Sequence, residues 1–472
     1  MDIFKLKTIN EVLESANKNS GLKKTLGVGS LFLLGLGAII GTGIFGMTGI
    51  AAVNMSGPAV TISYAIAGIT AIFIALTYTE IATMIPTSGG AYSYTFIAFG
   101  EIMAWLVSWM LILYFITSSS TVAACWSGYM VNMLHSGGIN IPMELTKNPA
   151  QGGIVNLPAL LISIVVTLIL IRGTKESAII NGLLVLIKVV AIGIFIYVAA
   201  PHFDTVHWFE HNHPFQSDLL MSNSFLPFGI SGVISGAAFV FFAYNGFDAI
   251  ASAAEESKNP KRDLTLAILG SLTVCMILYM IVAALLVGII PFHLIDVDSS
   301  IPSALSHNGH HIISSVIAGG VVIGMISVIL AQLFALSRII LVTARDGLLP
   351  AFLTKIHPKY HTPYASILSL GAIVALVSGF IPLEVIGTLS SVGALFSFMI
   401  VCMAMIMLRR RYPDIKRPFK CPAAYFVSGF GILLCLTLLV AALKVVGLYV
   451  AIWVVAGIAF YFIYYTMRTG TQ

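Results

Sequence analysis

Long apolar stretches separated by short polar segments recur along the whole chain. A helix needs about 20 residues to cross a hydrocarbon core of about 30 Å, and most of these stretches reach that length. The pattern predicts an all-α integral membrane protein with about twelve transmembrane helices. We place the spans at residues 27–54, 58–85, 101–133, 156–172, 178–200, 230–255, 264–290, 312–344, 363–381, 384–408, 422–443 and 446–467.

Two of these stretches are interrupted near their centres by backbone that is not typical of a helix. The first interruption is Gly41-Thr42-Gly43, and the second is Ala243-Tyr244-Asn245-Gly246. An unpaired peptide group in hydrocarbon is costly, so a broken membrane helix persists only where its freed N–H and C=O groups face a cavity, an ion or a ligand. Two such breaks near the midplane indicate a transport site.

Spans one to five and six to ten can be overlaid as two halves, each with the break in its first span. Because each half has an odd number of spans, the second half starts on the opposite side of the membrane, which is the inverted repeat of many secondary transporters. The predicted divisions are an N-terminal segment at 1–26, a first repeat at 27–200, an extracellular loop at 201–229, a second repeat at 230–408, a basic loop at 409–421, and helices 11 and 12 with a short tail at 422–472.

Composition agrees with a membrane location, since 58% of the residues are hydrophobic, 9% are charged, and the mean hydropathy is +0.99. A soluble domain has about a quarter of its residues charged. The first 25 residues contain no short apolar region followed by a small-residue cleavage site, so a removable signal peptide is not expected. The first span is expected to direct insertion.

Lysine and arginine gather in alternate loops and predict the orientation. They are Lys5, Lys7, Lys18, Lys23 and Lys24 before the first span, then Arg172, Lys175, Lys258, Lys261, Arg262, Arg345, Lys355, Lys359, Arg409, Arg410, Arg411, Lys416, Arg417 and Lys420, with Arg468 near the end. By the positive-inside rule, both termini are cytoplasmic in a multi-pass protein of the cell membrane. The net charge of +5 reflects this bias and not a nucleic-acid partner. The segment 86–100, also placed inside, has neither lysine nor arginine.

Three sequence runs resemble a known family. They are Gly37 to Phe45, Phe241 to Asp248 continuing through Glu255-Glu256-Ser257-Lys258-Asn259-Pro260-Lys261-Arg262-Asp263, and Arg345-Asp346-Gly347-Leu348-Leu349-Pro350. In order and spacing the chain is similar to the amino acid–polyamine–organocation superfamily, and within it to bacterial relatives of the cationic amino acid transporters. This resemblance implies the leucine-transporter-type five-plus-five fold with broken helices 1 and 6. It does not name the substrate.

The two breaks suit an amino acid zwitterion. A half-helix that begins at the midplane offers free N–H groups and partial positive charge, and one that ends there offers free carbonyls and partial negative charge. The N–H groups of Thr42 and Gly43, with the Thr42 hydroxyl, would bind the carboxylate. The ammonium group would face backbone carbonyls of both breaks, namely those of Ile39, Ile40, Phe242, Ala243 and Asn245. The resemblance implies the same assignment. The alternative is that the glycines serve close helix packing.

Lys188 is the costliest side chain in the sequence, because it lies near the centre of the apolar run 180–198 and cannot easily reach either surface. Burial favours the neutral form of a lysine, so such a group can take up and release a proton. The resemblance implies a lysine on the fifth span whose ammonium group stands where sodium-coupled relatives hold a sodium ion. Ser327 on the eighth span is the predicted hydroxyl partner. The alternatives are a purely structural cation and a serine that only faces a neighbouring helix.

Four acidic residues have two interpretations each. Asp248 follows the second break and could bind substrate or an ion, but an aspartate in the first turn of a half-helix also caps free N–H groups. Glu80, Glu255 and Glu256 could pair with Arg338 or Arg345 as an inner gate, or could be solvated helix ends.

Tyr114 stands on the third span where cationic amino acid transporters of this family tend to have a carboxylate. A cationic side chain in a pocket of low dielectric needs a paired charge or dense hydrogen bonding. The sequence therefore predicts neutral substrates, with Tyr114, Phe242 and Asn245 near the substrate side chain.

The remaining chemistry-bearing residues predict no metal or cofactor site. The outer loops contain His202, His207, His211, His213, His307, His310 and His311, whose spacing could suit zinc, although solvated loop residues are the simpler interpretation. The five cysteines show no disulfide framework and no C-x-x-C spacing, so we interpret them as packing residues.

No nucleophile, base and orienting group, or phosphate-binding loop, indicates an enzyme. The predicted function is secondary active transport of amino acids by alternating access, as proton-coupled symport of neutral L-amino acids, with the amino acid, protons and the lipid bilayer as partners. The alternatives are an exchanger, a transporter of cationic amino acids or polyamines, a channel, because broken helices also line pores, and a sensor without transport.

Overall fold

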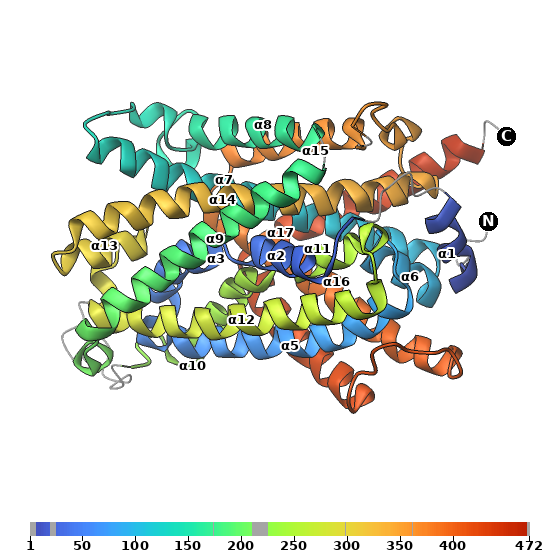
Figure 1. Ribbon diagram of the computed structural model, residues 1–472, viewed down its shortest axis with the longest axis horizontal. Coiled ribbons are helices and arrows are strands. Elements are labelled where there is room, and N and C mark those ends of the chain that lie inside the picture. The colour runs from blue at the N-terminus through green and yellow to red at the C-terminus, as the bar shows by residue number, and fades with distance from the viewer. Residues whose placement is uncertain are drawn as a thin grey trace.

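The computed structural model describes residues 6–18, 25–172, 174–209, 225–297, 299–360 and 362–469. Within these ranges the chain is helical, and the one isolated pairing of extended backbone joins Leu26 to Ser257. Most helices run along the long axis of the molecule, and both termini lie at the same end (Figure 1). We call this end the terminal end and the opposite one the distal end.

The helices match the predicted spans to within a few residues. The first span consists of α2 (Val28–Ile39), α3 (Thr42–Phe45), α4 (Met47–Ala51) and a π-helical turn at Ala52–Ser56. The sixth consists of α10 (Gly229–Val240), a 3-10 turn at Phe241–Tyr244 and α11 (Phe247–Ser252). The other spans are α5 (Val60–Met84), α7 (Glu101–Ser136), α8 (Leu157–Ile171), α9 (Thr174–Ala199), α12 (Pro260–Ile289), α14 (His311–Arg345), α15 (Tyr364–Phe380), α16 (Leu383–Arg411) and α17 (Ala424–Thr469).

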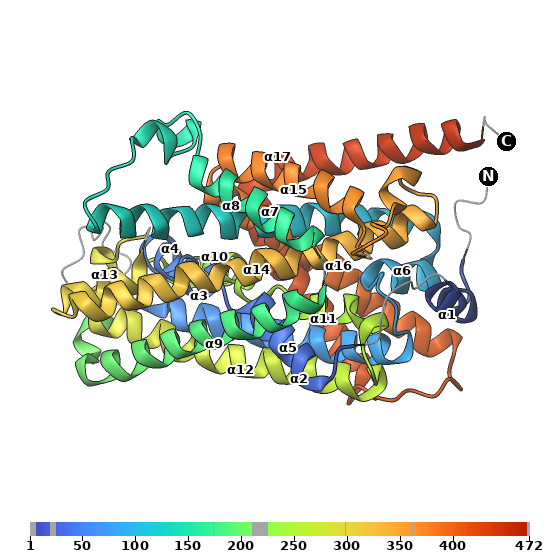
Figure 2. The same ribbon diagram turned by 45° about the horizontal axis from the view of Figure 1, so that its top comes forward.

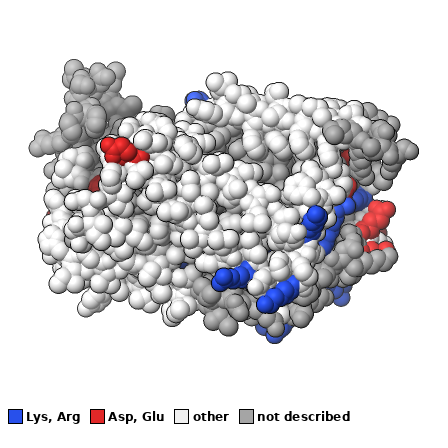
Figure 3. Space-filling model, turned by 90° about the horizontal axis from the view of Figure 1, so that it is seen from above, with Lys and Arg blue, Asp and Glu red and all other residues white. Residues whose placement is uncertain are grey.

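Among the described residues, nine helical stretches are long and apolar enough to cross a membrane, and α8 and α15 are shorter apolar helices. Large apolar side chains remain exposed on the outside of the bundle, including Leu161, Leu448 and Ile452. On the face shown in Figure 3, the middle of the molecule is nearly free of charge, and lysine and arginine gather toward the terminal end. An apolar surface of this extent suits contact with lipid.

The predicted spans eleven and twelve form one helical run, α17, instead of two separate helices. A straight helix of 46 residues would be about 69 Å long, far more than a membrane requires. Both of its ends contact the terminal end, because Ser428 Oγ lies 3.3 Å from Thr77 Oγ1 and the Tyr464 hydroxyl donates to the Leu349 carbonyl at 3.1 Å. The helix therefore bends back on itself, and its second arm returns to the C-terminus (Figure 2).

The segment 86–100, predicted as a loop, contains the helix α6 (Ala91–Phe99). Tyr92, Tyr94 and Phe96 on this helix are buried, and the Tyr92 hydroxyl donates to Asp346 at 2.6 Å. A segment packed into the bundle in this way has no room for solvated lysines, which explains why it lacks the positive charge of the other loops at this end. Two more helices lie outside the spans, α1 (Ile9–Lys18) and α13 (Ser300–His307).

Candidate substrate and ion-coupling site

The first break lies between α2 and α3. Helix α2 ends at Ile39, the backbone of Ile40 and Gly41 is extended, and α3 begins at Thr42. The N–H groups of Thr42 and Gly43 open a new helix and have no acceptor within it. The carbonyls at the end of α2 are freed in the same way.

The second break faces the first. Phe241–Tyr244 form a single 3-10 turn, Asn245 is extended, and Gly246 has a φ of +113°, a conformation that glycine adopts most readily. A Cβ atom built on Gly43 would overlap the backbone of Ala243, and one built on Gly246 would lie 2.8 Å from the carbonyl carbon of Ala38. The glycines therefore let the two broken helices approach each other.

Two buried polar atoms at this junction have no hydrogen-bond partner. They are the Thr42 hydroxyl and the Asn245 side-chain oxygen. Thr42 is fully buried and Asn245 nearly so. Since buried polar groups are normally paired, unpaired atoms from both breaks indicate a place where a polar ligand completes the structure. Phe242 and Ala243 are buried beside them.

Tyrosines from neighbouring helices bind the freed carbonyls of the first span. The Tyr279 hydroxyl donates to the Ile39 carbonyl at 2.7 Å, and the Tyr64 hydroxyl donates to that of Gly43 at 2.5 Å. The Tyr129 hydroxyl donates to the Phe45 carbonyl at 2.6 Å. These tyrosines were not predicted from the sequence. The available signal was their position within apolar spans, where a buried tyrosine hydroxyl needs a partner.

Lys188 reaches across from α9 to the first break. Its Nζ donates to the carbonyls of Gly37 at 2.8 Å and Ile40 at 2.5 Å, and to Ser327 Oγ on α14 at 2.9 Å. These three acceptors match the three N–H donors of an ammonium group, and none of them is a carboxylate. The end of α2 carries partial negative charge, which favours a cation. The predicted partners Lys188 and Ser327 therefore meet at the broken helix.

The carbonyls of Ile39 and Ile40, predicted to face the substrate ammonium group, are thus bound by Tyr279 and Lys188 in this conformation. Each carbonyl oxygen has two lone pairs, so a second hydrogen bond remains available. Their role toward substrate stays a prediction.

Tyr114 contacts the helix that follows the second break. Its hydroxyl donates to Asp248 Oδ1 at 3.1 Å, and the backbone N–H groups of Gly246 and Ala249 lie against the same carboxylate. Both side chains are buried. This geometry matches the capping interpretation of Asp248. It also places Tyr114 next to the junction, with Ser390 joining its backbone carbonyl to the Asn245 amide.

Comparison with known proteins decides the identity of the chain. The family model described as amino acid permease matches residues 26–467. The chain belongs to the amino acid permease family. Membership makes it a multi-pass membrane transporter of the superfamily that its sequence motifs resemble, and not an enzyme.

Several relatives are similar to the permease over most of its length. It is 39% identical to the branched-chain amino acid permease BcaP of Bacillus subtilis, over 98% of this chain and 97% of that protein. It is 36% identical to the methylthioribose transporter of the same organism, with the same coverage of both chains. It is 34% identical to the vacuolar cationic amino acid transporter 4 of Arabidopsis thaliana, over 84% of this chain and 66% of that protein.

Ion pairs close the terminal end of the permease. Arg338 lies 3.4 Å from Glu256 and its guanidinium group covers the ring of Phe334, so the predicted pairing of Glu256 is present. Glu255 accepts the backbone N–H of Ser88 at 2.8 Å. Lys7 forms an ion pair with Asp346.

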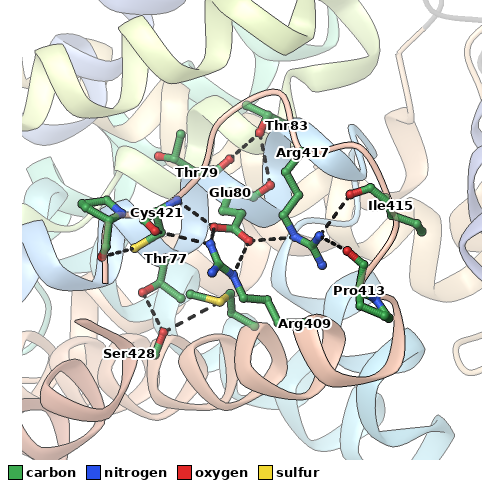
Figure 4. A network of polar contacts seen from close by, with 12 residues as sticks. Thr77, Thr79, Glu80, Thr83, Arg409, Pro413, Ile415, Arg417, Cys421 and Ser428 are labelled. Atoms are coloured by element: carbon green, nitrogen blue, oxygen red, sulfur yellow. Dashed lines mark hydrogen bonds and ion pairs between the residues drawn. The ribbon is translucent and has the colours of Figure 1, made fainter. Parts of the chain in front are cut away.

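For Glu80, the predicted pairing with Arg338 or Arg345 is wrong. Its buried carboxylate on α5 accepts two hydrogen bonds from Arg409 at 2.8 and 2.6 Å, and Arg417 Nε lies 3.0 Å away (Figure 4). The backbone N–H of Cys421 donates to it at 2.7 Å. Glu80 therefore holds the loop between α16 and α17 against α5.

A cavity of about 310 Å³ lies on the distal side of the first break. It begins at Gly46 and Ile50, just beyond the end of α3, and continues between α7 and the start of α16, past Asn132 and Glu384. At the terminal end, a cavity lined by Lys7, Glu255 and Arg345 has a volume of only about 20 Å³. The larger of these two cavities therefore lies on the distal side of the broken helices.

Two of the seven outer-loop histidines, His211 and His213, lie outside the described residues. In the part that the structure describes, no three histidine, cysteine or acidic side chains are grouped to hold a metal. All five cysteines are buried, and no disulfide joins any two of them.

Proposed function

We propose that this permease is a proton-coupled symporter of neutral L-amino acids in the cell membrane, working by alternating access. Two five-span halves, 27–200 and 230–408, would form the transport unit around the broken first and sixth spans. The concentration of lysine and arginine at the terminal end supports a cytoplasmic location for both termini.

Substrate recognition rests on the junction of the two breaks. The free N–H groups and hydroxyl of Thr42, with the N–H of Gly43, would bind the carboxylate at the start of α3. The carbonyls of Ile39, Ile40, Phe242, Ala243 and Asn245 would receive the ammonium group. Support comes from the unpaired Thr42 hydroxyl and Asn245 oxygen, which are buried at this junction.

The proposal of proton coupling rests on the contact of Lys188 with both α2 and α14. A charged Lys188 donates three hydrogen bonds and holds the broken span against the eighth. A neutral amine has only two N–H donors and no charge to interact with the end of α2. Loss of the proton would therefore weaken this contact and shift a two-state equilibrium.

Uptake driven by an imposed pH gradient tests this coupling. In sodium-free proteoliposomes, an inside-alkaline gradient should drive accumulation of substrate by the parent protein. Lys188→Ala should no longer accumulate substrate in response to the pH gradient, while exchange of one amino acid for another can continue. Lys188→Arg should also lose this response, because arginine keeps its charge. Val190→Ala, a change on the exposed face of the same helix, should accumulate substrate like the parent.

Undiminished gradient-driven accumulation by Lys188→Ala would contradict the proposed role of Lys188, and so would accumulation that depends on sodium. Counterflow by the parent without any response to the gradient would favour the rival function, an amino acid exchanger with Lys188 as a fixed cation.

A preference for neutral substrates follows from the surroundings of Asp248. This carboxylate, the acidic group beside the second break, already accepts a hydrogen bond from Tyr114 and faces backbone N–H groups. A cationic side chain would find no uncommitted carboxylate there. The similarity to a permease named for branched-chain amino acids supports this preference, and the similarity to cationic amino acid transporters keeps the rival open.

Competition against uptake of one labelled amino acid tests the preference. Neutral amino acids should compete well, and arginine and lysine should compete poorly. Tyr114→Glu should shift the preference toward cations, because it places a second carboxylate beside Asp248. Tyr114→Phe, which removes only the hydroxyl group, should keep the neutral preference. If arginine competes best with the parent protein, the neutral assignment is wrong.

A further inference from the structure

Two histidines meet at the distal end of the bundle. His202 ends the 3-10 turn Ala200–His202 that follows α9, and His310 directly precedes α14. Their Nε2 atoms lie 3.4 Å apart, and their rings are nearly perpendicular, at 82°. The two side chains come from segments 108 residues apart in the sequence, so the fold brings them together.

A neighbouring carbonyl sets the tautomer of His202. Its Nδ1 lies 3.0 Å from the Val198 carbonyl oxygen, which can only accept a hydrogen bond. The proton of the neutral ring is therefore on Nδ1, and the lone pair is on Nε2, facing His310. A metal-binding histidine is typically oriented in this way, with its other nitrogen donating to a carbonyl or carboxylate.

The spacing of the two nitrogens suits a shared metal ion better than a direct hydrogen bond. A hydrogen bond from an N–H group is usually about 2.7–3.2 Å long. Zinc binds histidine nitrogens at about 2.0–2.1 Å in tetrahedral geometry, which places two such nitrogens about 3.4 Å apart. The observed separation has this value without any movement of the two rings.

We propose that His202 and His310 form a binding site for a divalent transition metal ion of the zinc class. Two histidines supply half of a tetrahedral shell, and water would complete it, because no third histidine, cysteine or acidic ligand is grouped with them among the described residues. Binding is therefore weak and reversible compared with a structural zinc site.

The bound ion would join the distal ends of α9 and α14. These are the helices that carry Lys188 and Ser327, whose hydrogen bond joins them deeper in the bundle. A metal bridge would restrict relative movement of the two helices and slow transport. This consequence requires only that the helices move during the transport cycle, and it does not depend on whether protons are coupled.

Zinc binding to the purified full-length protein tests the site directly. Zn²⁺ is titrated in competition with a chromogenic chelator, for the parent, His202→Ala, His310→Ala and the double variant. Each single change should weaken binding at least about tenfold, since even loss of a second-sphere partner costs 10–100-fold. The double variant should be little worse than either single one, because one ligand alone cannot bridge. His311→Ala, an exposed neighbour outside the pair, is the matched control.

The five cysteines are buried, and because Cys125 lines the distal cavity, all variants are compared in a Cys125→Ser background. Parent-like affinity in both single variants would overturn the proposal, and so would an equal loss in His311→Ala. The bridge itself is tested by uptake into proteoliposomes with Zn²⁺ on both sides. Zinc should slow uptake by the parent and leave His310→Ala unaffected, whereas equal inhibition of both proteins would overturn the bridge.

Discussion

At the scale of single residues, the contact between the two breaks depends on glycines, which have no side chain to keep the two backbones apart. A Cβ atom on Gly43 would overlap Ala243, whose backbone cannot move without displacing the second broken helix. Gly193, also in an apolar span, has open space where its side chain would be. Replacement of glycine by valine should therefore impair transport at position 43 and have little effect at position 193.

Gly43→Val is expected to abolish uptake while the protein still inserts and remains monodisperse in detergent, because the substitution separates the two half-helices without adding charge. Gly193→Val should transport at close to the parent rate. Uptake of labelled substrate, normalised to the amount of inserted protein, measures both variants. Normal transport by Gly43→Val would remove this junction as the substrate site.

The same residues show how far the sequence could predict the candidate site. The unpaired peptide groups of the two breaks and the buried Lys188 are costly in a membrane, so their positions indicated function from the sequence, and the structure brings Lys188 and Ser327 together. The partners Tyr64 and Tyr279 were not predicted, because a tyrosine in an apolar span gives no sign of which carbonyl it will reach. Tyr64 lies 21 positions from Gly43 and Tyr279 lies 240 positions from Ile39, and both contacts depend on the packing of whole helices.

At the scale of helices, α5 and the end of α16 are held together by one carboxylate. Glu80 is buried, whereas Arg409 is partly exposed and Arg417 is more deeply covered. Breaking a buried ion pair by removal of one partner costs about 3–5 kcal/mol, because the other charge stays buried without compensation. Here one deletion would take the carboxylate away from both arginines, which would keep only hydrogen bonds to backbone carbonyls.

Glu80→Ala is therefore expected to lower the apparent melting temperature in detergent and to expose the loop between α16 and α17 to protease. Arg410→Ala removes an exposed charge one residue from Arg409 and should change neither measurement. A thermal shift assay and limited proteolysis of both variants check the difference. Equal stability of the two variants would show that the Glu80 contacts contribute little.

The helices themselves were largely predictable, because an apolar run of about 20 residues has few stable alternatives in a membrane. The two differences have physical reasons. Helix α17 continues through the turn at the distal end, where no proline stands between its arms in the way that Pro58 separates the first two spans. Helix α6 is too short to span a membrane. Its tyrosines are polar enough to occur in a loop, so the sequence did not indicate that they are buried.

At the scale of the whole molecule, the two ends are in different states. The ion pairs of Glu256, Glu80 and Lys7 close the terminal end, while the larger cavity leads from the first break toward the distal end. In a permease with cytoplasmic termini the larger cavity faces the outside, which is where an importer would receive its substrate. The orientation of the chain in the membrane therefore determines which side the larger cavity faces.

Labelling of intact cells with a membrane-impermeant maleimide tests this orientation. Ile139→Cys, exposed just beyond the distal end of α7, should react, whereas Phe352→Cys, exposed in the turn after α14 at the terminal end, should react only after the cells are opened. Four of the five native cysteines should give little background, because they are buried and do not line the distal cavity. Burial also raises the pKa of the Cys421 thiol, in the loop before α17, to about 11, so this thiol stays protonated and unreactive near neutral pH. Cys125 lines the distal cavity, so a Cys125→Ser parent is the appropriate background. Labelling of Phe352→Cys in intact cells, without labelling of Ile139→Cys, would reverse the proposed orientation and place the larger cavity on the cytoplasmic side.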